Sequence, residues 1–473
     1  MLIKDYLDTV CEQIRFQKAH SFVKKELKDH INDQAEAFVC SGMDEQTAMQ
    51  KAIAEMGDPV TIGTKLDRVH RPKLEWSFIV FIIVFSCFNL GIRFIVQQNN
   101  PVSHYEHFIS VPMILSILFG ILVMIAVYYV DFTILANHSQ KIYLLYLTIM
   151  ILIHIYLTFL GISVNGALAY IDVPFGTFKI PSLLYLFPVI LIGLLYDCRG
   201  KSYHAILLCG ASFLPPAFLS LNKGNNAVIL VIAMVSVLLI VMSICKNWFA
   251  VKKSFALLLF LLPTTIITIY SSFLISYFHN RLIRIFDIIK GTEQTYSMEI
   301  LQNNLKGASL FGMGELFYTP KGDFIQLPMV LTKDYFTAYI LYYSGWIIFI
   351  IFLVIYCFFI GKGFLLAWKQ KSQLGSMTAF SVLLTIVFTM LWNLIFSSGL
   401  LVDINPLEIP FFSYSGSANI MFFILMGILL SVFRTGAVTT DNCIKVEKKT
   451  FITFSENDIN ISIPLPSKRK KRL

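Results

Sequence analysis

Long apolar runs dominate the chain from Trp76 onward and are separated by short polar breaks. Each run is about 20 residues long, which is the length an α-helix needs to cross a lipid bilayer. We therefore predict an all-α, polytopic membrane protein with about ten transmembrane helices. They are expected near residues 76–96, 108–130, 142–162, 181–196, 203–221, 227–245, 254–278, 335–360, 377–401 and 415–433.

Residues 1–72 follow a different pattern and predict a separate domain. They are charged and rich in Gln, and apolar residues recur with a helical period in "YLDTVCEQI" and "VKKELKDHINDQAEAFV". Gly42 is placed to end one helix, Asp44 to N-cap the next, and Gly57 to end that one. The pattern indicates a small cytoplasmic helical bundle ahead of a membrane domain over residues 73–435.

Charge sets the expected orientation of the helices in the membrane. The 473 residues carry a formal charge of +9, but Lys and Arg of membrane proteins collect on cytoplasmic segments, so no nucleic-acid partner is expected. The short outer connections carry only Lys179 and Lys223, which favours a multi-pass protein with both termini cytoplasmic. Residues 436–473 form a basic cytoplasmic tail, which either lies against anionic head groups or is solvated. The inner connections carry Lys141, Arg199, Lys201, Lys246, Lys252, Lys253, Lys362, Lys369 and Lys371.

One connection, residues 279–334, is much longer than the others. Long loops in compact proteins are usually functional, so we expect the chemistry of the protein in this outer loop. Its basic side chains suit an anionic lipid head group, although a solvated face explains them equally well. The stretch "LFGMGE" places Gly312 and Gly314 in a tight turn. The basic residues are Arg281, Arg284, Lys290, Lys306, Lys321 and Lys333.

Four stretches in a fixed order carry a resemblance to a known family. The order "NRLIRIF", "KGASLFGMG", "TKDYFTAYILYYSGW" and "NPLEIPFFSYSGSANIMFFILMGILLSVFR" resembles the SEDS family of FtsW, RodA and SpoVE. The resemblance covers roughly residues 76–435. It implies a ten-span protein of the bacterial cytoplasmic membrane that polymerises lipid II into cell-wall glycan beside a class B penicillin-binding transpeptidase. The front domain resembles the helical permease-prefix module, on "ELKDHI", "SGMDEQTA" and "MGDP".

The resemblance also implies roles for single residues. The family's outer aspartate falls on Asp334, after Thr332 with Lys333 inserted, and the implied role is general base. From the residues alone, Asp334 is better explained as the N-cap of the eighth span. Matches to the loop proline, the glycine turn and the late Pro-Phe-x-Ser-Tyr-Gly-Gly-Ser motif, together with the basic loop residues, give the expected substrate-binding set. That set is Arg281, Arg284, Lys306, Lys321, Lys333, Gly312, Gly314, Pro328, Ser413, Tyr414 and Ser417.

Four departures from the family pattern keep other functions open. Leu183 replaces the glutamate after Pro-Ser, Met329 stands where many members have glutamate, Ser415 replaces a glycine, and the central Pro-Asp is absent. One alternative is a catalytically degenerate regulator that binds lipid II. Another is a lipid-handling protein or transporter, which discontinuous spans with paired polar residues at the membrane midplane would favour.

The implied reaction sets chemical requirements that the sequence meets only in part. A base must take a proton from the acceptor hydroxyl, and a cationic group must stabilise the departing diphosphate lipid. Mg²⁺ or Mn²⁺ is a candidate cofactor because diphosphate is rich in oxygen, but no protein metal site is predicted. Inside the spans, Asn393 is expected to bond between helices, and His154 to be neutral and hydrogen-bonded.

Overall fold

The computed structural model shows two helical parts, each with its own apolar core. It describes residues 2–70, 75–99, 111–160, 162–164, 167–173, 176–221, 227–274, 301–302, 305–314, 335–398, 407–411, 416–436, 452–454 and 459–461.

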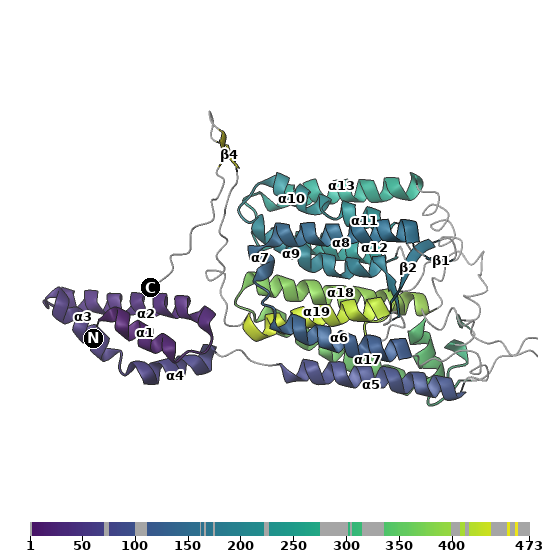
Figure 1. Cartoon of the computed structure of the whole chain (residues 1–473), viewed down its shortest axis with the longest axis horizontal. Coiled ribbons are helices and arrows are strands. Elements are labelled where there is room, and N and C mark those ends of the chain that lie inside the picture. Colours follow the sequence, from purple (N-terminus) through teal and green to yellow (C-terminus); the bar gives the residue numbers. More distant parts are fainter. Residues whose placement is uncertain are drawn as a thin grey trace, which may run out of the picture.

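The first part is the bundle that the N-terminal pattern predicts. Its helices are α1 (Ile3–Glu12), α2 (Gln17–Cys40), α3 (Glu45–Glu55) and α4 (Pro59–His70). They lie side by side in Figure 1. Their shared apolar core includes Tyr6, Val10 and Ile31. The predicted N-cap is confirmed, since an Asp44 carboxylate oxygen accepts the Thr47 amide at 3.0 Å. Gly42 and Gly57 both have positive φ, as helix-ending glycines do.

The second part is a bundle of long apolar helices that lie side by side in Figure 1. Among the described residues, eight helical segments are long and apolar enough to cross a membrane, and α6 and α13 contain shorter apolar stretches. Each of the ten predicted spans coincides with a helix or helix pair, so the predicted polytopic all-α fold is confirmed and the protein is an integral membrane protein. The helices are α5 (Trp76–Asn99), α6 (Val111–Tyr129), α7 (Ile134–Asn137), α8 (Ser139–Leu160), the 3₁₀ helix η1 (Ile180–Leu186), α9 (Phe187–Asp197), α10 (Tyr203–Ala211), α11 (Leu214–Ser220), α12 (Ala227–Cys245), α13 (Lys253–Leu274), α17 (Phe336–Trp368), α18 (Gln373–Ser397) and α19 (Gly416–Thr435).

Short strands add a feature that the apolar pattern did not predict. After α8, strands β1 (Ile162–Val164), β2 (Ala167–Val173) and β3 (Gly176–Lys179) form an antiparallel sheet in the order β1-β2-β3. The last strand, β3, leads directly into η1. In Figure 1, β1 and β2 lie at one end of the membrane bundle. In the tail, β4 (Ile452–Phe454) pairs with β5 (Ile459–Ile461).

Helices α18 and α19 form the centre of the membrane bundle, and most of their residues are buried. Helix α19 packs closely on α6, with Gly427 set against the Met124 carbonyl. A Cβ at Gly427 would lie 2.7 Å from that oxygen. Small residues at such crossings let two helices approach within van der Waals contact in lipid, where no hydrophobic effect drives association.

Helix α17 is broken at Gly345, whose φ of 85° and ψ of 170° are not helical. The part from Trp346 to Trp368 is about 34 Å long at 1.5 Å per residue, enough to cross the roughly 30 Å hydrocarbon core alone. The break therefore lies near one membrane interface. The helical turns before the break, residues 336–344, include the buried side chains of Thr337, Ala338 and Leu341.

Residues 309–314 satisfy the backbone groups that the break leaves free. The Trp346 amide donates to the Ser309 carbonyl at 3.1 Å, and the Gly314 amide donates to the Tyr342 carbonyl at 2.8 Å. Two further bonds, Ile347 to Leu310 and Gly312 to Ser344, complete the pairing. Irregular backbone at membrane depth is tolerated where protein supplies its partners, and this segment does so.

Alanine at Gly345 should destabilise the membrane domain by about 1–3 kcal/mol, because φ is positive and a Cβ would lie 2.8 Å from the Leu310 carbonyl oxygen. Gly361 in the same helix is the matched control, since nothing lies within 4 Å of a Cβ there. Thermal unfolding in detergent should show a lower midpoint for Gly345→Ala and no loss for Gly361→Ala. Equal midpoints for the two variants would show that the break does not need glycine.

Acid should weaken the cap of α3. Hydrogen bonds from the Thr47 hydroxyl and amide hold the pKa of the Asp44 carboxyl below its ordinary value of 3.8. The cap therefore stabilises fully above about pH 4 and is lost as pH falls through the lowered folded pKa. Asp44→Asn keeps a good cap that does not titrate. Unfolding of the N-terminal bundle should become more acid-sensitive with Asp44 than with Asn, and identical pH profiles would contradict this origin of the shift.

Candidate functional site

Most of the residues that the sequence singles out fall outside the described part of the chain. Lys306, Gly312, Gly314 and Ser417 are described. The residues outside are Arg281, Arg284, Lys321, Pro328, Lys333, Asp334, Ser413 and Tyr414. The described residues that adjoin them in the chain make up the candidate site.

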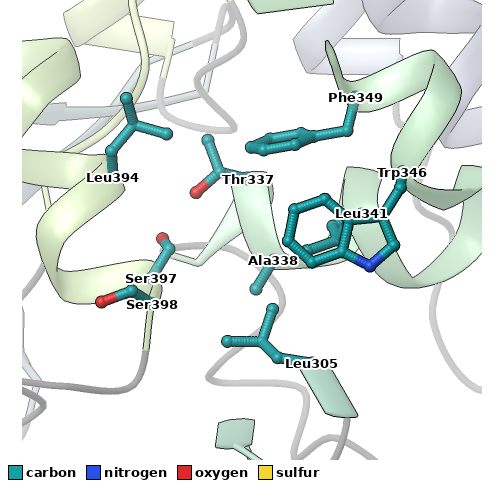
Figure 2. Close-up of a pocket in the computed structure, with 9 residues that line it drawn as sticks. All are labelled: Leu305, Thr337, Ala338, Leu341, Trp346, Phe349, Leu394, Ser397 and Ser398. Atoms are coloured by element: carbon teal, nitrogen blue, oxygen red, sulfur yellow. The ribbon is translucent and has the colours of Figure 1, made fainter. Parts of the chain in front are cut away.

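A cavity of about 190 Å³ lies at the N-terminal end of α17. Figure 2 shows Trp346 and Phe349, from beyond the break, facing Leu394 and the serine pair at the end of α18. Asp334 stands three residues before Thr337 in the sequence, and Lys306 directly follows Leu305. The cavity is mainly apolar, and its hydroxyl groups come from one threonine and two serines. Its lining residues are Leu305, Thr337, Ala338, Leu341, Trp346, Phe349, Leu394, Ser397 and Ser398.

Gly312 and Gly314 form the tight turn that the sequence predicts. Glycine is needed at the two positions for different physical reasons. Gly312 has a φ of +83° with open space around a Cβ position, so its backbone angle requires glycine. Gly314 is confined by space, since a Cβ would lie 2.6 Å from the Gly307 carbonyl oxygen and 2.9 Å from the Tyr342 ring. Both glycines therefore hold residues 309–314 against the broken helix. Lys306, three residues before this segment, is exposed.

The buried amide of Asn393 joins the cavity wall to the segment 407–411. The Thr337 hydroxyl donates to Asn393 Oδ1 at 2.8 Å, and the Ser397 hydroxyl donates to the same oxygen at 3.1 Å. Asn393 Nδ2 donates to the Leu407 carbonyl. The prediction that Asn393 bonds between helices is confirmed. His154 is likewise hydrogen-bonded as predicted, with Nδ1 3.2 Å from the Leu219 carbonyl oxygen.

The segment 407–411 is held by polar side chains from three directions. Besides Asn393, Asn89 of α5 donates to the Phe411 carbonyl at 3.0 Å, and Arg93 Nε donates to Asn89 Oδ1 at 2.8 Å. Glu408 accepts from Lys179 of β3 at 2.9 Å. These contacts fix irregular backbone, including Phe411 with a φ of 70°, at the same end of the bundle as the cavity.

Sequence reasoning missed Asn89, Arg93 and Glu408. A signal existed for the first two, because a polar amide and a guanidinium inside an otherwise apolar span are functional candidates by default. Both are buried, at 0% and 3% exposure. Glu408 carried no such signal, since it stands in a short connection where charged residues are ordinary.

Ser417, which the resemblance places among substrate-binding residues, lies in the first turn of α19 and is buried. Its hydroxyl lies 3.0 Å from the Ser182 hydroxyl and accepts the Lys179 amide at 3.2 Å. These bonds tie α19 to β3 and η1. Next to Ser182, Leu183 is buried, and its carbonyl accepts the Tyr146 hydroxyl at 3.4 Å.

No group of three or more His, Cys, Asp or Glu side chains among the described residues could hold a metal ion. The expected Mg²⁺ or Mn²⁺ requirement stays a prediction.

The sequence matches the family described as cell cycle protein, which comprises FtsW, RodA and SpoVE, over residues 75–437. The match spans most of the chain, and the protein therefore belongs to this family, the SEDS proteins. No curated protein matches the chain.

Two solved structures share the fold. The first is a chain of a solved structure that bears the description "Structural coordination of polymerization and crosslinking by a peptidoglycan synthase complex". It is 17% identical with a TM-score of 0.55, and the alignment covers 76% of this chain and 98% of that one. The other is an aspartate-to-alanine variant of the Rod shape determining protein RodA of Thermus thermophilus. It is 15% identical with a TM-score of 0.52, and the alignment covers 77% of this chain and 98% of that one.

Alanine at Asn393 should destabilise the protein by about 1–3 kcal/mol, because the buried Leu407 carbonyl and the Thr337 hydroxyl would lose their partner. Thr385→Val is the matched control on the same helix, since the Thr385 hydroxyl bonds only within α18 in the contacts described, to the Ser381 carbonyl at 2.7 Å. Thermal unfolding should show the larger loss for Asn393→Ala. A larger loss for Thr385→Val would mean that Asn393 does not connect the two segments.

Proposed function

We propose that the protein polymerises lipid II into glycan strands at the outer face of the cytoplasmic membrane. Membership of the SEDS family and the fold shared with a chain of a peptidoglycan synthase complex support this function. The observation that carries it is the cavity at the N-terminal end of α17. One residue of its wall, Thr337, stands three positions after Asp334 in the sequence. A polymerase needs a base beside a space that admits a lipid-linked sugar.

In this proposal Asp334 is the general base. It takes the proton from an acceptor sugar hydroxyl while that oxygen attacks the anomeric carbon of the donor, and the diphosphate lipid leaves. The leaving diphosphate is stabilised by cationic groups, for which Arg281, Arg284, Lys306 and Lys321 are candidates, together with Mg²⁺ or Mn²⁺. Lys306 is exposed and follows the cavity residue Leu305, a placement that supports its share in this role.

The charge distribution and the shared fold also support a membrane topology and a partner. The loop 279–334 and the cavity face outward, and both termini lie in the cytoplasm, as the Lys and Arg distribution favours. A class B penicillin-binding transpeptidase is the proposed partner, since the glycan must be crosslinked. The fold shared with a chain of a synthase complex for polymerization and crosslinking supports such a partner.

Asp334→Asn should lower glycan synthesis at least about 100-fold, because an amide cannot accept the proton. Purified protein in lipid nanodiscs, supplied with lipid II and Mg²⁺ or Mn²⁺, is assayed for glycan ladders on gels. Asp323→Asn, which changes another acid of the same loop, is the matched control and should retain synthesis. Chelation of the cation should reduce synthesis in the wild type.

Wild-type ladders that Asp334→Asn still makes would remove this residue from the base role. A second candidate function is a regulator that binds lipid II without polymerising it. Leu183, buried where family members carry glutamate, favours it. Binding of lipid II without ladders, even beside a partner transpeptidase, would select the regulator.

A further inference from the structure

The ion pair between Lys179 and Glu408 helps to hold segment 407–411, but it uses only one of the two carboxylate oxygens of Glu408. Lys179 ends β3, Glu408 lies in the segment 407–411, and Lys179 Nζ is 2.9 Å from Glu408 Oε1. The side chain of Glu408 is 11% exposed and that of Lys179 is 24% exposed. A carboxylate this far from water stays ionised only where a counter-charge and hydrogen bonds compensate its lost hydration.

The compensation is incomplete at one atom. Glu408 Oε2 is buried and has no hydrogen-bond partner within the part of the chain that the structure describes, while Oε1 accepts from Lys179. A buried acceptor without a donor is costly and uncommon, and it calls for an explanation. An incoming donor would remove the cost. Oε2 therefore marks a position for a ligand atom rather than a finished internal contact.

The chemistry of that ligand atom follows from its neighbours. The ammonium of Lys179 already balances the carboxylate and would repel a second cation at hydrogen-bond range. Ser182 and Ser417, which lie beside β3, have hydroxyl groups that bond each other and the Lys179 backbone. A neutral donor, either a hydroxyl or an amide N–H, fits Oε2 better than a metal ion. Saccharides with N-acyl groups present both kinds of donor.

The pair is connected to the cavity at the N-terminal end of α17 through hydrogen bonds of one side chain, Asn393. Glu408 directly follows Leu407, whose carbonyl accepts from Asn393. Asn393 in turn accepts from Thr337 and Ser397, which line the cavity. One side chain thus links the backbone that carries Glu408 to the cavity wall. A lipid-linked saccharide with its reacting sugar in the cavity would extend toward the ion pair with its other polar groups.

We propose that Glu408 is a substrate-binding residue whose Oε2 accepts a hydrogen bond from a hydroxyl or amide of the lipid-linked saccharide, while Oε1 stays paired with Lys179. The inference rests on the proposed function and adds a recognition contact to it. Lys179 is partly exposed, so the pair lies close to the protein surface. The contact is made before the chemical step and kept during it, so it contributes to binding more than to turnover.

Glu408→Gln tests the proposal with almost no change of shape. Lys179 would hold the amide oxygen, which turns the NH₂ group toward the position of the ligand donor. Binding of lipid II to the protein in nanodiscs should weaken at least tenfold. In the glycan assay KM should rise at least tenfold with kcat within about threefold of wild type, the pattern of a lost ground-state contact. If Glu408 had a purely structural role, Glu408→Gln would lower the unfolding midpoint and the yield of folded protein, and KM would not rise separately from kcat.

The exchanged pair Lys179→Glu with Glu408→Lys is the control for folding. It keeps an ion pair between the two segments but puts an ammonium where the carboxylate stood. It should unfold near the wild-type midpoint and still bind lipid II at least tenfold more weakly. Wild-type affinity in folded Glu408→Gln, or in the folded exchange variant if the single variant does not fold, would overturn the proposal.

These outcomes are separable from failure of the proposed polymerase function. Wild type that makes ladders, with an unchanged KM in Glu408→Gln, rejects the role of Glu408 alone. Wild type that binds lipid II but makes no ladders rejects the polymerase, and the binding comparison still decides for Glu408. Wild type that does not bind lipid II rejects both.

Discussion

Backbone hydrogen bonding at the membrane interface is the constraint on which this structure depends. Helix α17 breaks at Gly345, and a break in a span is stable only when protein groups satisfy the amides and carbonyls that it frees. Residues 309–314 supply those partners, and Gly312 and Gly314 shape the segment that does so. The cavity exists because the broken helix contributes wall residues from both sides of the break, including Thr337 and Trp346.

A second irregular segment, residues 407–411, is fixed by the same rule. Its carbonyls accept from Asn89 and Asn393, and Glu408 pairs with Lys179. A rigid frame of this kind holds functional groups in place without a change of conformation, which is what proton transfer and sugar recognition require. The broken span also fits a transporter in principle. However, the break lies near one interface rather than at the midplane, and the proposed polymerase uses it there.

The sequence predicted the spans well because length and apolarity alone decide whether a helix crosses a bilayer. The break at Gly345 escaped prediction, since "YYSGWII" continues an apolar run and one glycine in a helix is ordinary. Its cause is a contact with Leu310 and Phe311, which are distant in sequence. The partners of Asn89 and Glu408 also come from other elements, so no local pattern reports them. Of the candidate site, Asn393 and the glycine turn were predicted correctly, whereas the role of Asp334 rests on family resemblance.

Amide hydrogen exchange in lipid nanodiscs tests the central claim, that paired irregular backbone frames the site. The Gly314 and Trp346 amides donate to the Tyr342 and Ser309 carbonyls, so they should exchange as slowly as amides in the middle of α18. Exchange of these two amides at the fast rate of free loop residues would mean that the break is not held by residues 309–314. The cavity would then not be framed by paired backbone at the break.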